Sequence, residues 1–281
     1  MSTLTVGQIV KVLEALYPLR YAEDWDEPGL IVGDTGWQVS KIYCAVDPTE
    51  ETVSAAISAG AQLLITHHPL YFRATHTVAG STFRGALVTK LIENHCALWV
   101  GHTNADSAVR GQGKAFVEAL GLKDCGALVP REDGRSEDKQ EVERVGLGRI
   151  GEYDQAISLA EFAKRVSDVL PRSQSGILIA GDPHRQVRRV AALPGSGDSE
   201  IKKAAACGAD VYVTSDLRHH PVLDAVQETG MAFINTPHAA IEKLWFNLAQ
   251  TDIPEALLTR YGVDIPLEVT RINTDPWSMR I

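Results

Sequence analysis

Short apolar runs that alternate with amphipathic stretches restrict the fold of this 281-residue chain more than any other feature. The runs fall in two groups, one in each half: Ile42–Val46, Leu63–Thr66 and Ala97–Val100, then Val190–Leu193, Val211–Thr214 and Ala232–Asn235. Stretches with helical spacing, such as Glu50–Ala59 and Glu200–Cys207, stand between them. Continuous apolar runs are typical of strands that are buried on both faces. Their alternation with helices predicts an α/β fold with mostly parallel sheets that are flanked by helices.

The two halves also resemble each other. Ala55–Ala61 and Lys203–Ala209 have similar sequences, and each precedes an apolar run with a threonine at its end. This repetition predicts two similar α/β lobes, with a metal site in the cleft between them. We expect the lobes at residues 1–129 and 145–281, joined by a charged linker loop at 130–144.

Single segments add three elements to this outline. Thr5–Gln8 has the spacing of a capping box and is followed by apolar residues on one helical face, so the chain is expected to begin with a helix rather than a targeting segment. In the second half, Gly146–Gly151 is typical of a strand. Ser158–Val169 predicts a helix that begins at a serine cap.

Composition narrows the class of partner. A net charge of −9 argues against nucleic-acid binding, which normally needs a basic stripe on the protein surface. The sequence contains no run of 18 apolar residues, so a membrane-spanning helix is not expected. The cysteines are scattered without a paired spacing, which indicates free thiols and a cytoplasmic protein. The four cysteines are Cys44, Cys96, Cys125 and Cys207.

Histidines and carboxylates follow the predicted strands directly. His67 and His68 come after one strand, while His102 with Asp106 and His238 with Glu242 share a spacing of four residues that puts both side chains on one helical face. Imidazole and carboxylate are ligands of zinc and other transition metals, and more of them occur here than one tetrahedral ion needs. The pattern therefore predicts two divalent ions per subunit, Zn, Mn, Fe, Co or Ni. The expected ligands are His67, His68, Asp106, His238 and Glu242.

The histidines outside the expected ligand set fall into two groups. His102, His219 and His220 also follow predicted strands, at the edge of an open parallel sheet where ligands bind. His102 is expected beside the metals, orienting Asp106, and His102 and His220 are the candidates for catalytic proton transfer. Either His219 or His220 could instead contact the substrate without binding metal. The remaining histidines are expected at the surface: His76, His95 and His184.

Two glycine-containing segments leave alternatives open. Pro194–Ser199 joins a strand to a helix, where backbone N–H groups could hold an anion, but its spacing is that of neither a P-loop nor a dinucleotide fingerprint. A tight turn is the favoured interpretation. Trp25–Asp34 is expected to be a loop leading into a short strand, and its residues alone assign it no function.

Taken in order, these segments resemble the Nif-three-like family, whose bacterial members are called GTP cyclohydrolase 1 type 2 homologues. The matching residues span nearly the whole chain: Trp25, Asp26, Gly29, Leu30, Gly33, Asp34, Thr66–Pro69, His102, Thr103, Asp106, Gly146–Gly151, Gly208–Asp210, Thr214, Asp216, His220, His238 and Glu242. The resemblance implies a two-lobed α/β protein, a dinuclear metal centre with the five ligands named above, and a toroidal homohexamer. Ser215 and Pro194 depart from the family pattern, which bears on the cleft wall near His220.

Two functions from different classes fit these features. The leading hypothesis is a metal-dependent hydrolase of a nucleotide-like substrate, in which the ions activate a water and His102 or His220 moves the proton. The family label would make the reaction an attack on C8 of guanine. The alternative is a non-enzymatic protein that stores, delivers or senses metal, or a ring-shaped scaffold that binds protein partners. A fold and a metal site do not by themselves fix a substrate.

Overall fold

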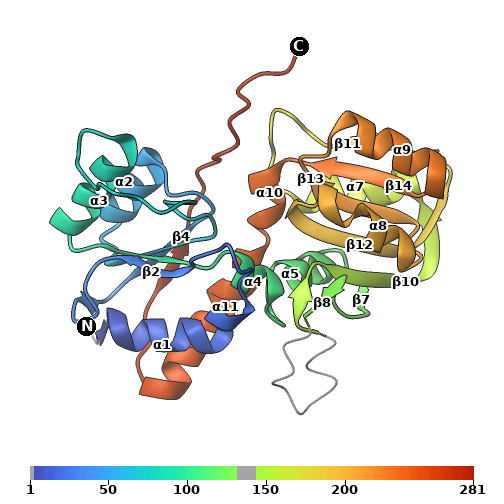
Figure 1. Ribbon diagram of the computed structural model, residues 1–281. Coiled ribbons are helices and arrows are strands. Elements are labelled where there is room, and N and C mark those ends of the chain that lie inside the picture. The colour runs from blue at the N-terminus through green and yellow to red at the C-terminus, as the bar shows by residue number, and fades with distance from the viewer. Residues whose placement is uncertain (1–2, 132–143) are drawn as a thin grey trace. The chain divides into compact units, whose positions relative to one another are not determined.

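The chain folds around two separate sheets in the computed structural model, which describes residues 3–131 and 144–281 (Figure 1). One compact unit combines Met1–Ala105 with Phe246–Thr274, and the second combines Asp106–Trp245 with Asp275–Ile281. These units differ from the expected lobes at 1–129 and 145–281, because residues 106–129 belong to the second unit and the last long helix and strand belong to the first. Most of the expected linker 130–144 falls on residues 132–143, which lie outside the described part of the chain.

The first unit contains a five-stranded sheet in the order β15-β4-β5-β6-β2. All of its strands are short: β2 (Gly29–Val32), β4 (Ile42–Ala45), β5 (Leu63–Thr66), β6 (Ala97–Val100) and β15 (Leu267–Val269). The first four strands in the order run parallel, and β2 is antiparallel to β6. The three strands predicted in the first half are therefore confirmed. Every residue of β4, β5 and β6 is buried, which explains their uninterrupted apolar sequence.

Helices cover both faces of this sheet (Figure 1). α2 (Glu50–Ser58) and α3 (Phe83–Glu93) pack on the face that carries Tyr43, Leu64 and Leu98, and α1 (Val6–Leu16) and α11 (Trp245–Tyr261) lie on the other. The predicted capping box begins α1, where the side chains of Thr5 and Gln8 each accept from the other's backbone N–H. The smaller elements are β1 (Leu4–Thr5), which pairs with β3 (Gln38–Val39), and the 3-10 helix η1 (Leu19–Tyr21).

The second unit contains a six-stranded sheet in the order β11-β14-β13-β12-β10-β7. The strands are β7 (Lys123–Asp124), β10 (Arg149–Ser158), β11 (Leu178–Ala180), β12 (Gln186–Ser196), β13 (Val211–Ser215) and β14 (Ala232–Thr236). β12, β13 and β14 are parallel and contain the three apolar runs predicted as strands. The other three strands pair antiparallel with their neighbours.

The strand expected over Gly146–Gly151 is wrong as a single element. Gly148 has φ +66°, a left-handed conformation that breaks a strand, and the chain forms two strands on either side of it. The first, β9 (Gly146–Leu147), pairs with β8 (Val129–Pro130), and the second is the start of β10. The glycine thus redirects the chain between two sheets.

The helices of the second unit flank its larger sheet. α8 (Ile201–Ala206) and α9 (His219–Thr229) contribute to one core with Tyr212 and Phe233, whereas α5 (Gln112–Ala119) and α7 (Leu159–Val169) contact β10 and β12. Ser158 caps α7 as predicted, accepting from the N–H of Glu161. The shorter helices are α4 (Thr103–Ser107), the 3-10 helix η2 (Asp198–Glu200) and α10 (His238–Glu242).

The two units share a local plan. In each, three sequential strands lie side by side in parallel, and the third has an antiparallel neighbour at the sheet edge: β2 beside β6, and β11 beside β14. That third strand leads into a short helix, α4 or α10, which carries the carboxylate of the His-x3-acid pattern. The repetition in the sequence is thus accompanied by a repetition in strand order.

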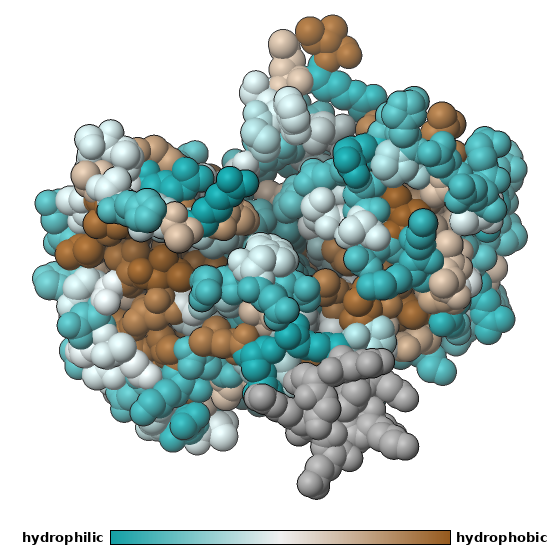
Figure 2. Space-filling view, in the orientation of Figure 1, coloured by the Kyte–Doolittle hydropathy of each residue, from teal (hydrophilic) through white to brown (hydrophobic). Residues whose placement is uncertain are grey.

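The surface of the protein is mainly hydrophilic on the face shown in Figure 2, where hydrophobic residues form separate patches. Among the helices of the described residues, none combines the length and the apolar character that a membrane crossing requires.

Candidate functional site

Three histidines gather at the carboxyl ends of β5 and β6 in the first unit. His67 and His68 follow β5 directly, and His102 stands two residues after β6. Each offers a ring nitrogen that lies within 4.8 Å of the other two. Both residues of the His67–His68 pair can join this cluster because the chain bends after β5, where the Thr66 hydroxyl donates to the carbonyl of His68 over 2.8 Å.

The rings of His67 and His68 are held through Nδ1. Nδ1 of His67 donates to the carbonyl of Gly101 over 2.8 Å, and Nδ1 of His68 lies 2.6 Å from a carboxylate oxygen of Asp47. Because these oxygens only accept, Nδ1 carries the proton and Nε2 keeps its lone pair in the neutral ring. Histidines that bind metals through one nitrogen commonly donate the other N–H to a carbonyl or carboxylate in this way.

The ring of His102 is oriented by Asp26 of the Trp25–Asp34 loop, to which the sequence alone assigned no function. Its Nδ1 lies 3.0 Å from Oδ1 of Asp26, whose side chain is 3% exposed. The other oxygen of Asp26 accepts from the backbone N–H and the hydroxyl of Thr103, over 3.0 and 2.5 Å. Burial would raise the pKa of Asp26, but the close contact with His102 and the hydrogen bonds from Thr103 outweigh it and hold the pKa below its usual value. The ionised Asp26 therefore fixes both the ring of His102 and the start of α4.

Aromatic side chains flank His102. The exposed ring of Trp25 lies edge-on to it, with 5.7 Å between centroids, and so does the exposed ring of Phe72, also at 5.7 Å. Phe72 also lies 6.4 Å from the ring of His68. The histidine cluster of the first unit is thus bordered by two aromatic rings that are open to solvent.

A second group of ligand atoms lies in the second unit. In α10, Nε2 of His238 is 2.9 Å from a carboxylate oxygen of Glu242, one turn later, as the spacing predicted. Nδ1 of His238 lies 2.6 Å from Asp216. With the proton on Nδ1, the lone pair of Nε2 faces the 3%-exposed carboxylate of Glu242, an arrangement that needs a cation or a second proton between them. This donor set fits a divalent transition-metal ion.

The Pro194–Ser199 segment supports Glu242. A Cβ atom built on Gly195, which has φ +84°, would lie 2.6 Å from a carboxylate oxygen of Glu242 and 3.7 Å from Nε2 of His238. The carbonyl of Gly195 also accepts from the hydroxyl of Thr214 over 2.9 Å. The glycine is needed because the strand passes directly against the candidate ligands.

Asp106 occupies α4, half-buried, at the point where the chain enters the second unit. The segment after it is held by the buried guanidinium of Arg149, which donates to the carbonyls of Ala108 and Val109 over 3.3 and 2.9 Å. Burial lowers the pKa of Arg149, although the group remains a cation at neutral pH. A methyl group on Gly113 would collide with Arg149 at 2.8 Å, so the motif around Gly148 and Arg149 fixes the backbone behind Asp106.

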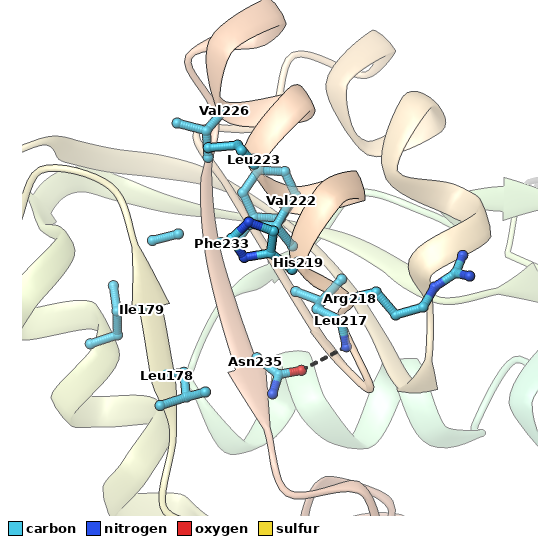
Figure 3. Close-up of a pocket in the computed structure, with 11 residues that line it drawn as sticks. Leu178, Ile179, Leu217, Arg218, His219, Val222, Leu223, Val226, Phe233 and Asn235 are labelled. Carbon is cyan, nitrogen blue, oxygen red and sulfur yellow. Dashed lines mark hydrogen bonds between the residues drawn. The ribbon is translucent and has the colours of Figure 1, made fainter.

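His219 and His220 begin α9 and are both exposed. His219 lines an apolar groove of about 360 Å³ between α9 and β11, shown in Figure 3. In this view Asn235 accepts from the backbone N–H of Leu217, and Arg218 extends away from the groove. His220 makes no hydrogen bond or ion pair within the described residues. The three histidines expected at the surface are exposed: His76, His95 and His184.

The sequence interpretation did not assign functions to four residues that position the candidate ligands. Asp47 and Asp216 each follow a parallel strand within two residues, so their place at a sheet edge was a usable signal. Asp26 and Gly195 offered no comparable signal, because their roles depend on contacts across the fold.

Comparisons with known proteins agree with this architecture. The family model described as Duf34/NIF3 (NGG1p interacting factor 3) matches residues 4–276. A Streptomyces coelicolor protein named GTP cyclohydrolase 1 type 2 homolog is 42% identical over 277 residues, covering 98% of this chain and 94% of that protein.

Solved structures show the same fold. A Staphylococcus aureus hypothetical protein superposes with a TM-score of 0.86 at 26% identity, covering 98% of this chain and 99% of that one. A Bacillus cereus protein related to NIF3 gives a TM-score of 0.86 at 24% identity, covering 99% of both chains. By its sequence over nearly its whole length, the chain belongs to the Duf34/NIF3 family.

Proposed function

We propose that the protein is a metal-dependent hydrolase of a nucleotide-like substrate. The observation that carries this proposal is the partner of each histidine Nδ1: a carbonyl for His67 and a carboxylate for His68 and for His238. Three rings oriented through Nδ1 in this way are typical of metal ligands rather than of structural histidines. The five ligands proposed are His67, His68, Asp106, His238 and Glu242.

The donor set limits the metal. Imidazole and carboxylate donors without a thiolate suit Zn, Mn, Fe, Co and Ni, and we propose two such ions per chain. When bound, divalent ions supply Lewis-acid activation of a water and stabilise negative charge on the substrate. The surrounding residues orient the ligands, so that little reorganisation is needed at the moment of reaction.

His102 is the better of the two catalytic candidates. Asp26 holds its Nδ1, so that Nε2 can accept or return a proton beside His67 and His68. His220 is exposed and makes no hydrogen bond or ion pair within the described residues, which gives less support for a role in proton transfer.

The first substrate to test is GTP, because the Streptomyces relative carries the name GTP cyclohydrolase 1 type 2 homolog. Hydrolysis would add water at C8 of guanine and cleave the C8–N9 bond, which opens the imidazole ring and leaves C8 as a formyl group on N7. The experiment is to load the purified protein with Zn, Mn or Fe in turn, determine bound metal by elemental analysis, and follow GTP by its ultraviolet spectrum and by chromatography.

We expect metal-dependent turnover that falls by about a hundredfold in His102→Gln, the range for removal of a general acid or base. Bound metal should change little in this variant. Stoichiometric metal without turnover of any nucleotide would reject the hydrolase and favour a protein that stores, delivers or senses metal. Turnover that persists after chelation would reject the role of the ions.

We further propose that the protein is a toroidal homohexamer of the cytoplasm. The family resemblance supports the ring, and cysteines that form no disulfide support a reducing compartment.

A further inference from the structure

A cavity next to the histidine cluster of the first unit is cationic. It has a volume of about 440 Å³ and is lined by the loop that follows His68 and by the start of α3. Two arginines, Arg73 and Arg84, line it together with three threonines, and its lining includes no carboxylate. The whole segment from Leu70 to Gly85 lacks Asp and Glu, in a chain whose net charge is −9. The cavity is therefore complementary in charge to an anion.

The two guanidinium groups are available to a ligand in different ways. Nε of Arg84 donates to the carbonyl of Leu70 over 2.7 Å, which fixes the group and leaves its terminal N–H donors for another acceptor. Arg73 is exposed, and its side chain forms no ion pair or hydrogen bond with any described residue. Guanidinium groups match the oxygens of phosphate and can bind two of them at once.

The loop that carries Arg73 is ordered by its own hydrogen bonds. The hydroxyl of Thr75 donates to the carbonyl of Thr77, and the hydroxyl of Thr77 accepts from the N–H of Ala79. At the start of α3, the hydroxyl of Thr82 accepts from the N–H of Gly85. These bonds hold the cavity in shape before a ligand arrives, which reduces the entropy lost on binding.

Phe72 connects this cavity to the histidines. Its ring lines the cavity and also lies 5.7 Å from the ring of His102 and 6.4 Å from that of His68. Trp25 borders His102 as well, and both aromatic rings are exposed, at 61% for Trp25 and 55% for Phe72. Exposed aromatic rings beside a polar site are suited to stacking with a flat heterocycle.

We propose that the cavity binds a phosphate group of the substrate, so that the substrate class is a phosphorylated nucleotide whose base lies against Phe72 and Trp25. The inference rests on the proposed function, because it assigns the substrate of the same histidine cluster. It also gives Arg73 and Arg84 a role in specificity that is separate from metal binding.

Binding of GTP and of guanosine, measured by calorimetry on the metal-loaded protein, tests this assignment. Unmodified protein should bind GTP at least about tenfold more tightly than guanosine, because guanosine has no phosphate to pair with the arginines. Arg73→Gln should weaken GTP binding by about tenfold and leave guanosine binding unchanged. Phe72→Leu should weaken both ligands by about fivefold or more.

The matched control is Arg188→Gln, which removes the same charge from an exposed arginine of the second unit. It should alter the binding of neither ligand. Equal affinities for GTP and guanosine, no binding of either, or equal effects of Arg73→Gln and Arg188→Gln would each overturn the inference.

The outcomes also separate this inference from the hydrolase. Phosphate-dependent binding that is sensitive to Arg73→Gln, without any turnover, would sustain the cavity assignment and reject the enzyme. Metal-dependent hydrolysis of guanosine and GTP at equal rates, insensitive to Arg73→Gln, would sustain the enzyme and reject the cavity assignment. Phosphate bound by the metal ions alone would be insensitive to Arg73→Gln.

Discussion

The backbone at Gly195 passes so close to Glu242 that a single added methyl group would lie 2.6 Å from the carboxylate. Gly195 also has φ +84°, so two constraints act on one residue. The backbone of β12 therefore restricts the position of the Glu242 carboxylate, a candidate metal ligand.

Gly195→Ala should consequently lower metal content as well as stability. The alanine must shift Glu242 or the strand, which we expect to weaken metal binding by at least about tenfold, as for other disturbed ligand supports. Unfolding by denaturant should show a loss of about 2 kcal/mol or more, from the left-handed backbone and the collision together. Gly230→Ala is the control, since Gly230 has φ +66° and nothing within 4 Å of an added Cβ. Equal metal content in both variants would contradict the role given to Gly195.

Glu242→Ala should remove at least one of the two proposed ions. Without this carboxylate, two divalent cations would repel each other with less negative charge to offset them, and the donor opposite Nε2 of His238 would be lost. Elemental analysis after reconstitution is the measurement. His184→Ala, which changes an exposed histidine, should retain full metal. Full metal in Glu242→Ala would remove Glu242 from the ligand set.

Asp216→Asn should weaken metal binding about tenfold to a hundredfold while the protein stays folded, because Asp216 fixes Nδ1 of His238. Asn tolerates the left-handed conformation of Asp216, at φ +56°, so the substitution adds no backbone strain. Titration with a competing chelator gives the affinity. Asp224→Asn, at an exposed position of α9, is the comparison, and equal affinities in the two variants would reject Asp216 as a positioning residue.

The rate of cysteine alkylation should distinguish the buried thiols from the exposed one. Burial raises the pKa of Cys96 to about 12 and raises that of Cys44 as well, so neither thiol ionises or reaches reagent in the folded protein. Cys125 is exposed, although partial burial also raises its pKa, so its alkylation should still accelerate as the pH rises above about 8.5, the ordinary thiol value, because the thiolate fraction is still growing there. Mass spectrometry after brief treatment with iodoacetamide identifies the sites. Rapid native labelling of Cys96 would contradict the packing of β6.

The proposed hexamer predicts a mass near six times 30.5 kDa in light scattering at micromolar concentration. Since most homo-oligomers have closed symmetry, intermediate masses should be absent under native conditions. A single species near 30.5 kDa would reject the ring.

The sequence predicted the strands that are buried on both faces, because a continuous apolar run is a strong local signal. The short strand expected at the end of the Trp25–Asp34 loop corresponds to β2, but the sequence did not reveal β7, β11 and β15, which are short and lie at sheet edges. Their pairing depends on partners far along the chain, as when Leu267 of β15 pairs with Ile42 of β4. Local propensity has little influence over such strands.

The candidate ligands follow from local sequence spacing, whereas the residues that position them are brought close by contacts over long sequence distances. The spacing of His238 and Glu242 is a property of one helical turn, visible in the sequence. The contact of Asp26 with Thr103 spans 77 residues, and that of Asp47 with His68 spans 21. Only the folded chain brings these residues together, so the sequence could place Asp47 and Asp216 at a sheet edge but could not identify which histidine each carboxylate contacts.

The return of the chain into the first unit has a consequence for biosynthesis. β15 pairs with β4, and Thr270 accepts from the hydroxyl of Tyr43 over 3.1 Å, so the first sheet cannot be completed until residues near 270 have left the ribosome. The second sheet has all of its strands between Lys123 and Thr236, which emerge earlier. During synthesis β4 therefore remains unpaired along one side after all strands of the second sheet have emerged and can pair. An unpaired strand edge can pair with another chain, so this interval of synthesis favours aggregation.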